Sequence, residues 1–183
     1  MPSDRSGRPD LALLIEFTNT MELGDGTDEF EEPSGLSKWL VARELAERRL
    51  DISRAQLARA VAVREGLRAL AWQNSAGVAD NPALASFQDA TRDLIMAPVV
   101  GPDGAVRMQP RATGLEGFLA GLLVTVNVAM LDGSWSRVKV CRNDKCRWLF
   151  FDRSRNRSGT WCDMSVCGNV MKARAYRRRA REK

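Results

Sequence analysis

Apolar residues recur along most of this chain at the spacing of α-helices, and only a few stretches suit strands. Residues 11–20 combine Leu, Ile, Phe and Thr in one short apolar run, which favours a buried strand. An acidic segment with glycine and proline follows at residues 21–35 and predicts a loop. Residues 36–50 place leucine, tryptophan and valine near helical spacing with charges opposite, which predicts an amphipathic helix.

Capping residues predict two further helices. Ser53 is a candidate N-cap for a long helix that stops before Gly77, because glycine suits the left-handed turn after a helix. Asn81 precedes a proline that suits the first helical position, so we expect another helix to start there.

The stretch at residues 97–110 predicts a hairpin, since two short strands flank the turn sequence Gly-Pro-Asp-Gly. Thr113 then lies three residues before Glu116, which is the spacing of a capping box. The helix that follows is apolar nearly all round, so we expect it to be the most buried one. Its apolar run, residues 118–130, is too short to span a bilayer and contains Asn127.

Together these elements predict an α+β fold that is mostly helical. We expect a disordered tail at residues 1–10 and a multihelical domain with a few short strands at residues 11–132. A small C-terminal module at residues 133–183 is expected to contain a β-hairpin and a basic helix.

All four cysteines lie in this C-terminal module, as Cys141-x4-Cys146, fifteen residues, and Cys162-x4-Cys167. Two close pairs at such a separation are typical of a zinc site with four thiolate ligands. The segment between them suits a fold-back, with a strand at residues 147–151, a polar turn and a return strand at residues 160–161. We therefore expect one structural Zn²⁺, which supplies most of the folding energy of the module.

Other uses of the cysteines are less consistent with the sequence. Disulfides belong to oxidising compartments, and a thioredoxin-type redox couple uses a C-x-x-C spacing. Iron–sulfur clusters also use other spacings. Four cysteine ligands leave no open position for water, which disfavours a catalytic zinc.

Charge is divided unevenly along the chain. The net charge is +5, but residues 133–183 carry a net +11 and residues 1–132 a net −6. Such a basic segment indicates a nucleic-acid partner. The absence of histidine excludes histidine general bases, and we expect no enzyme. The N-terminus lacks the apolar core of a signal peptide, so we expect a cytoplasmic protein without a membrane partner.

Arginines after the last cysteine are the candidate nucleic-acid contacts. Arg174, Arg177, Arg178 and Arg181 recur at i, i+3, i+4 and i+7, which places them on one helical face. The other predicted contacts are Lys172 and three arginines of the polar turn, Arg153, Arg155 and Arg157. The alternatives are a plain solvated surface and pairing with the acidic loop at residues 22–32.

The C-terminal sequence resembles the CGNR-type zinc finger of bacterial proteins. That pattern is Cys-x4-Cys, an aromatic strand, an Asp-x-Ser-x-Asn-like turn, and Trp-Cys-x4-Cys-Gly-Asn-Arg before a basic helix. The chain matches it at Cys141, Cys146, Trp148, Phe150, Asp152, Ser154, Arg155, Asn156, Trp161, Cys162, Cys167, Gly168 and Asn169. Val170 stands where the family has arginine. Residues 11–20 also resemble the N-terminal signature of the associated ABATE domain.

This resemblance implies a stress-induced transcription regulator, in which the finger binds DNA and the ABATE domain senses a ligand or stress. The substitution at Val170 removes a DNA contact if the family arginine binds DNA. It matters little if that arginine only supports the zinc turn.

Polar residues within apolar stretches are the candidate ligand site. The candidates are Glu16, Asn19 and Asn127. Arg64 and Arg68, on the predicted long helix, are the expected partners of Glu16. A buried carboxylate is costly unless it is paired, which motivates the pairing. The alternative is a satisfied internal network or exposure at an edge.

The predicted function is zinc-dependent DNA binding in transcription regulation, with an N-terminal domain that senses a ligand or stress. The alternative is a zinc-stabilised module that binds a small molecule or protein, with a structural finger that binds no DNA, or that binds RNA. The observation that separates them is whether the arginine face is free or covered. An oligomer is compatible with the sequence, although no heptad repeat indicates one.

Overall fold

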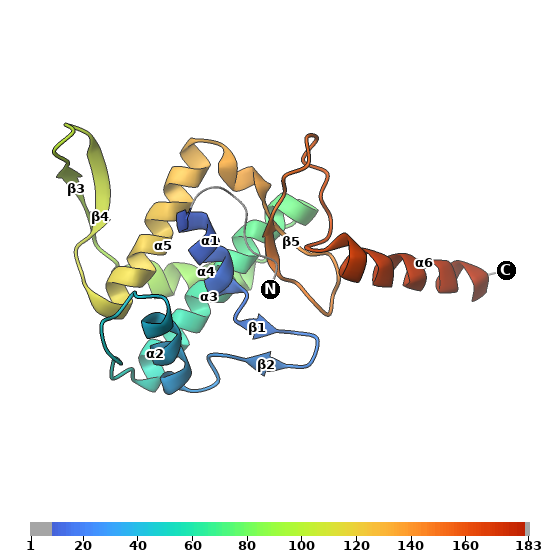
Figure 1. Cartoon of the computed structure of the whole chain (residues 1–183), viewed down its shortest axis with the longest axis horizontal. Helices are drawn as coiled ribbons and strands as arrows, with labels where there is room; N and C mark the ends of the chain where they lie inside the picture. The colour runs from blue at the N-terminus through green and yellow to red at the C-terminus, as the bar shows by residue number, and fades with distance from the viewer. Residues whose placement is uncertain (1–8, 182–183) are drawn as a thin grey trace.

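The computed structural model describes residues 9–181 and has a mostly helical α+β fold, as the sequence predicts (Figure 1). The helices are α1 (Pro9–Thr18), α2 (Pro33–Ala42), α3 (Arg54–Ala76), α4 (Asn81–Thr91), α5 (Gly114–Leu131) and α6 (Asn169–Arg181). Three antiparallel ribbons pair β1 (Met21–Glu22) with β2 (Thr27–Asp28), β3 (Met96–Val100) with β4 (Val106–Pro110), and β5 (Val138–Val140) with β6 (Leu149–Phe151). Two single turns are η1 (Ser134–Arg137) and η2 (Met164–Gly168). We call residues 9–132 the body and residues 133–181 the finger.

The strand predicted at residues 11–20 is wrong, because this segment forms α1. Leu11, Leu14, Ile15 and Thr18 are buried and recur at the i, i+3, i+4, i+7 spacing of one helical face. A short apolar run is ambiguous between strand and helix. Here the packing of this segment against α3 and α5 selects the helix.

Two more boundaries differ from the prediction. The helix predicted at residues 36–50 ends at Ala42, and the chain turns at Glu44 with a left-handed φ of 58°. Of the predicted disordered tail, residues 1–8 lie outside the described residues, and Pro9 already begins α1.

Four of the predicted helix caps can be compared directly. Ser53 caps α3 in a capping box and Gly77 follows it with a left-handed φ of 71°, both as predicted. The predicted cap Asn81 is wrong by one residue, since the side chain of Asp80 caps α4. Thr113 precedes α5 but makes no side-chain cap hydrogen bond, so its predicted capping box does not form.

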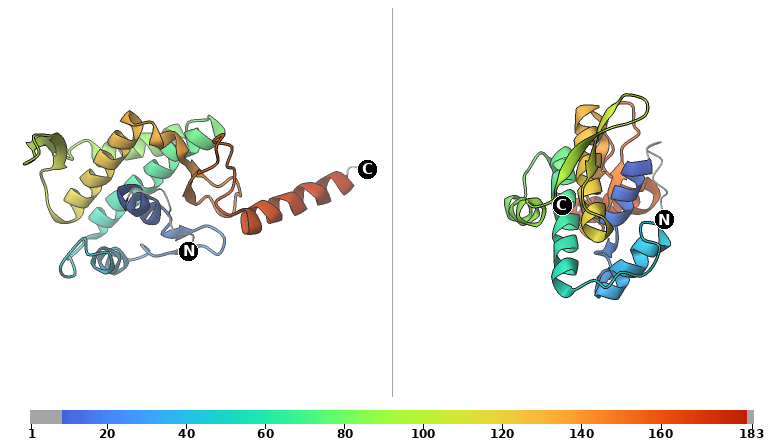
Figure 2. Two further views of the ribbon diagram at one scale, coloured as in Figure 1. Left: turned by 45° about the horizontal axis from the view of Figure 1, so that its top comes forward. Right: turned by 90° about the vertical axis from the view of Figure 1, so that its left-hand side faces the viewer.

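The core lies between α1, α3 and α5, and α3 also contacts α2, α4 and β5 (Figures 1 and 2). Rings from four segments meet there, with centroids 5.3–5.9 Å apart and tilted or edge-on planes. These rings belong to Phe17, Phe30, Trp39 and Phe118. Such edge contacts add to the hydrophobic stabilisation of the core.

α5 is not the most buried helix, contrary to the prediction. Val128, Met130 and Leu131 are 40%, 49% and 81% exposed near its end. α3 holds the central position instead. Among the described residues α5 is the helix that is long and apolar enough to cross a membrane, a measure that core helices of soluble proteins also satisfy.

The hairpin predicted at residues 97–110 is confirmed as the β3–β4 ribbon, with Val100 opposite Val106. We call this ribbon, residues 96–110, the arm. It projects from one end of the molecule, and α6 projects from the opposite end (Figure 1).

The strand pairing of the finger differs from the prediction. β6 pairs with β5, and residues 160–161 form no strand. The physical reason is burial: Val138 and Val140 are fully buried in the main core, and β5 packs on α3. The first cysteine pair therefore lies in the loop of the β5–β6 hairpin.

Candidate functional site

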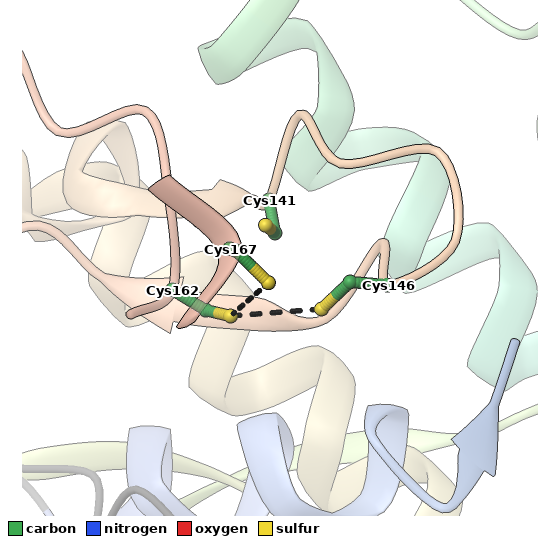
Figure 3. A group of neighbouring side chains, drawn as sticks. All are labelled: Cys141, Cys146, Cys162 and Cys167. Atoms are coloured by element: carbon green, nitrogen blue, oxygen red, sulfur yellow. Dashed lines mark hydrogen bonds between the residues drawn. The ribbon is translucent and has the colours of Figure 1, made fainter. Parts of the chain in front are cut away.

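Four thiols gather in the finger (Figure 3). The four Sγ atoms lie within 4.8 Å of one another, and all four cysteines are free. The sulfurs of Cys146 and Cys162 are 3.5 Å apart, and those of Cys162 and Cys167 are 3.8 Å apart. A tetrahedral zinc with sulfur ligands at about 2.3 Å separates its sulfurs by about 3.8 Å. The thiols therefore fit the one structural Zn²⁺ that the spacing predicts.

The first zinc turn is organised by Asn143. Its carbonyl oxygen accepts the N–H of Cys146 at 2.8 Å, which closes the turn after Cys141. Its buried side chain donates to the sulfur of Cys167 at 3.5 Å, and its Oδ1 lies 3.5 Å from the guanidinium of Arg174. Hydrogen bonds to ligand atoms orient them around a metal. Asn143 thus connects the metal centre to α6.

The second zinc turn depends on Asp163. Its carboxylate accepts the N–H groups of Ser165 and Val166 at 2.7 and 3.0 Å. These bonds cap η2, whose last residues include Cys167. Asp163 therefore fixes the path between the third and fourth sulfurs.

The crowded thiols cannot all ionise without a cation. Hydrogen bonds from the thiols of Cys146 and Cys162 lower the pKa of Cys141 to about 2. The contact with Cys141 raises the pKa of Cys146 to about 12, and it also raises the pKa of Cys162. Among these three thiols one thiolate is therefore favoured, and binding of a divalent ion displaces the protons of the other two.

A buried ion pair shapes the polar turn between the cysteine pairs. Nζ of Lys139 lies 2.7 Å from Oδ2 of Asp152, and both side chains are almost fully buried. Burial alone would raise the pKa of Asp152, but hydrogen bonds from Lys139, Ser154 and Gly159 lower it to about 2. Gly159 is required, because a Cβ there would lie 2.6 Å from the carboxylate.

α6 carries the arginine stripe, which we define as Arg174, Arg177, Arg178 and Arg181. These four side chains line one hollow of about 440 Å³. Within residues 9–181, none of them forms an ion pair with a carboxylate. α6 extends away from the body in Figure 1 and in the left-hand view of Figure 2. Arg177, Arg178 and Arg181 are exposed, whereas Arg174 is half-buried beside Asn143.

The other predicted nucleic-acid contacts lie apart from the stripe. Lys172 is exposed on the far side of α6, because about 100° per residue places it about 160° from Arg174. Arg153 and Arg155 are exposed on the polar turn. Arg157 is exposed there with a left-handed φ of 51° and donates to the hydroxyl of residue 136 at 2.9 Å.

The finger is docked on the body through Asn19, which directly follows α1, and through Arg68 of α3. Asn19 exchanges two hydrogen bonds with the backbone of Leu149, at 2.7 and 2.9 Å. The guanidinium of Arg68 donates to the carbonyl oxygens of Thr18 and Arg147, at 2.5 and 2.6 Å. Both contacts join the body to the strand and loop next to the metal centre.

Two polar residues near the end of α3 complete the docking, and the sequence gives no signal for them. Ser75 accepts the N–H of Val140 at 2.7 Å. Asn74 donates to carbonyl oxygens of η1 and β5 at 2.8 and 2.9 Å. The guanidinium of Arg147 also lies 3.9 Å from the ring centroid of Trp72.

The candidate ligand residues do not form one site. Glu16 is exposed and pairs with Arg43 at 3.0 Å, so its predicted pairing with the α3 arginines is wrong. Arg64 instead makes a two-pronged ion pair with Asp28, at 2.7 and 2.8 Å. Asn127 is exposed on α5. Asn19 and Arg68, the two other members of the set, dock the finger on the body.

The geometry defines a four-cysteine zinc-finger protein whose finger is anchored on a helical body and ends in a free basic helix. Residues 137–180 match the family model described as "CGNR zinc finger". Residues 11–132 match the ABATE model, described as "Putative stress-induced transcription regulator". The chain belongs to this ABATE family. No curated protein matches the chain.

The family arginine that this chain lacks would lie beside a cleft next to the metal centre. The cleft has a volume of about 640 Å³ and separates the β1–β2 ribbon, at Glu22 and Gly24, from the finger. Trp148, Val166 and Val170 form its apolar wall. Val170 precedes Arg174 by one helical turn, so it extends the line of the arginine stripe toward the cleft.

Proposed function

We propose that this protein is a bacterial, cytoplasmic transcription regulator that binds duplex DNA through α6 and the polar turn. The observation that carries the proposal is the arginine stripe, which forms no ion pair within residues 9–181 and lies on a helix that leaves the body. Arginines at this spacing repel one another by a few tenths of a kcal/mol per pair, so the arrangement suits an anionic partner. Zinc holds the start of α6 in place, and the C-terminal module predicted at residues 133–183, which contains the finger, is the binding unit.

The aromatic residues of the finger favour a duplex over single-stranded RNA or DNA. Binding of single strands relies on aromatic side chains on which bases stack. Trp148 and Trp161 pack against the cysteine cluster instead. Phe151 packs against the main core. Few rings are therefore left to stack on bases, whereas arginine contacts to phosphate suit a duplex.

The body, residues 11–132, is in this proposal the sensing domain. Its support is the direct docking of the finger, since Arg68 and Asn19 connect α3 and α1 to the loop and strand beside the zinc. A ligand or stress that shifts α1 and α3 would change the position of α6 through these few contacts. Coupling of this kind requires that two arrangements of the docked finger differ in DNA affinity.

A salt titration of DNA binding tests the proposal. Fluorescence anisotropy of the zinc-loaded chain with a random duplex would give an affinity that falls steeply between about 50 and 200 mM salt. The double variant Arg177→Gln/Arg178→Gln is expected to reduce the salt slope by about 2. The matched control is Arg48→Gln/Arg49→Gln, two exposed arginines of the body with the same change in net charge.

The outcome that contradicts the proposal is no duplex binding even at about 50 mM salt. Equal losses in the two double variants would show that only net charge matters. If the protein binds no duplex, the second candidate function stands. In that function the finger is a structural clamp on a domain that binds a small molecule or protein. The docking through Arg68 and Asn19 is the observation that favours it.

A further inference from the structure

One face of the arm is entirely apolar. In an antiparallel ribbon, residues directly opposite one another place their side chains on the same face. The pairs of one face are Met96 with Pro110, Pro98 with Met108, and Val100 with Val106. The alternate pairs, which include Arg107 and Gln109, carry the polar side chains. The arm is therefore amphipathic, with six apolar residues on one side.

This apolar face is not covered by any other part of residues 9–181. Val100, Val106 and Met108 are 69%, 65% and 45% exposed. A two-stranded ribbon is marginally stable in water by itself and gains stability when one face packs. The arm lacks that packing beyond its base, where Pro110 approaches α5.

The apolar surface continues onto α5. The ring of Pro110 would lie 3.9 Å from a Cβ at Gly121, so the base of the arm touches this helix. From Gly121, the residues Val124, Val128 and Leu131 recur at three- to four-residue spacing along one face. Val128 and Leu131 are 40% and 81% exposed. Arm and helix thus present one continuous apolar surface.

The surface carries little charge, although the chain has a net charge of +5. No charged residue occurs in residues 117–131. In the arm, Arg107 and Asp103 form a two-pronged ion pair with each other, at 2.5 and 3.0 Å. The basic α6 lies at the opposite end of the molecule (Figure 1). Two copies can therefore approach through the arm end without strong repulsion.

We propose that the arm and the outer face of α5 form the interface of a symmetric homodimer. Five apolar residues of this surface, Val100, Val106, Met108, Val128 and Leu131, are 40–81% exposed, and a standard interface buries roughly 800 Å² per partner. In a two-fold dimer the same patch serves both copies, which suits a surface with no charges to match. The dimer leaves the two arginine stripes free at the outer ends.

Measurement of molar mass by light scattering tests the interface with the zinc-loaded full chain. The wild type at about 50 µM is expected to have twice the chain mass of 20.3 kDa. Val100→Asp/Val106→Asp in the arm, and separately Leu131→Asp on α5, are expected to weaken dimerisation at least 100-fold. These residues are exposed in the single chain, so the variants should keep their circular dichroism and zinc content.

The matched control is Val78→Asp, since Val78 is 62% exposed and belongs to neither element. It is expected to remain a dimer. The proposal is overturned if the wild type has the single-chain mass at about 200 µM, or if the arm and helix variants stay dimeric. It is equally overturned if the control dissociates as they do, or if a monomeric wild type binds phospholipid vesicles. DNA binding is measured separately, so failure of the dimer does not mimic failure of the proposed function.

Discussion

The side-chain amide of Asn19 and the backbone of Leu149 exchange two hydrogen bonds across 130 positions of sequence. Nδ2 of Asn19 donates to the carbonyl oxygen of Leu149, and Oδ1 accepts its N–H. The side-chain amide therefore pairs with β6 as the backbone of a neighbouring strand would. It joins the end of α1 to the hairpin that carries the first two zinc ligands.

Replacing Asn19 by alanine is expected to loosen the finger from the body. Leu149 is 2% exposed, so its N–H and carbonyl groups would lose their partners without access to water. The expected cost is about 1–3 kcal/mol of unfolding free energy, measured by urea denaturation. Asn127→Ala is the matched control, because Asn127 is exposed, and it should change stability by less than about 0.5 kcal/mol. Similar losses in both variants would contradict the docking role.

The ion pair between Lys139 and Asp152 predicts a defined pH dependence. The pKa of Asp152 is lowered to about 2, so its carboxylate stabilises the fold above the ordinary pKa of about 3.9. This contribution is lost as the pH falls toward 2. Asp152→Asn is therefore expected to cost about 2 kcal/mol at pH 7, and the difference from wild type should shrink below pH 4.

Equilibrium unfolding at pH 7, 4 and 3 measures this difference. Asp144→Asn is the control, because Asp144 is exposed in the same finger. A difference between Asp152→Asn and wild type that stays constant over this pH range would contradict the assignment. Lys139→Met should destabilise more, by about 3–5 kcal/mol, since it leaves a buried carboxylate unpaired.

Local chemistry made part of this molecule predictable. The cysteine spacing fixes the zinc site because each pair needs only a tight turn, and Asn143 and Asp163 supply those turns from within the pairs. The arginine stripe follows equally from helical spacing. Both features depend on residues close in sequence, where periodicity and turn chemistry are informative.

Contacts distant in sequence explain what was predicted wrongly. The run at residues 11–20 suits a strand or a helix, and only its packing against α3 and α5 selects the helix. The return strand at residues 160–161 fails because β6 finds a buried partner in β5. Glu16 had no visible partner on α1, and the fold places it beside Arg43 at the surface.

Removal of zinc is expected to unfold only part of the finger. Val138 and Leu149 belong to the main core, whereas Cys167 of η2 belongs to the cysteine cluster and α6 packs on η2. Chelation or Cys162→Ser should therefore expose the amides of residues 162–181 to hydrogen exchange, while β5 stays protected. The binding energy lost is on the order of 10 kcal/mol.

Elemental analysis and hydrogen exchange measured on the same samples check this expectation. The chelated wild type should regain one zinc per chain and the protection of α6 when Zn²⁺ is returned, whereas Cys162→Ser should not. Stoichiometric zinc in Cys162→Ser would contradict the four-thiol site. Loss of protection in β5 together with α6 would contradict the independent anchoring of the hairpin.

Val170 offers a test of what the missing family arginine does. It lies on the line of the arginine stripe, four residues before Arg174, and is 40% exposed. Val170→Arg is expected to add one phosphate contact, which tightens duplex binding several-fold at about 50 mM salt and steepens the salt slope by about 1. Ala180→Arg adds the same charge to α6 but lies about 60° from Arg177 and about 100° from Arg181, off the line of the stripe, so it should change the slope less. An equal response to both substitutions would mean that charge, and not the direction of the stripe, governs binding. A Val170→Arg variant with unchanged affinity but higher thermal stability would instead assign the family arginine to support of the zinc turns.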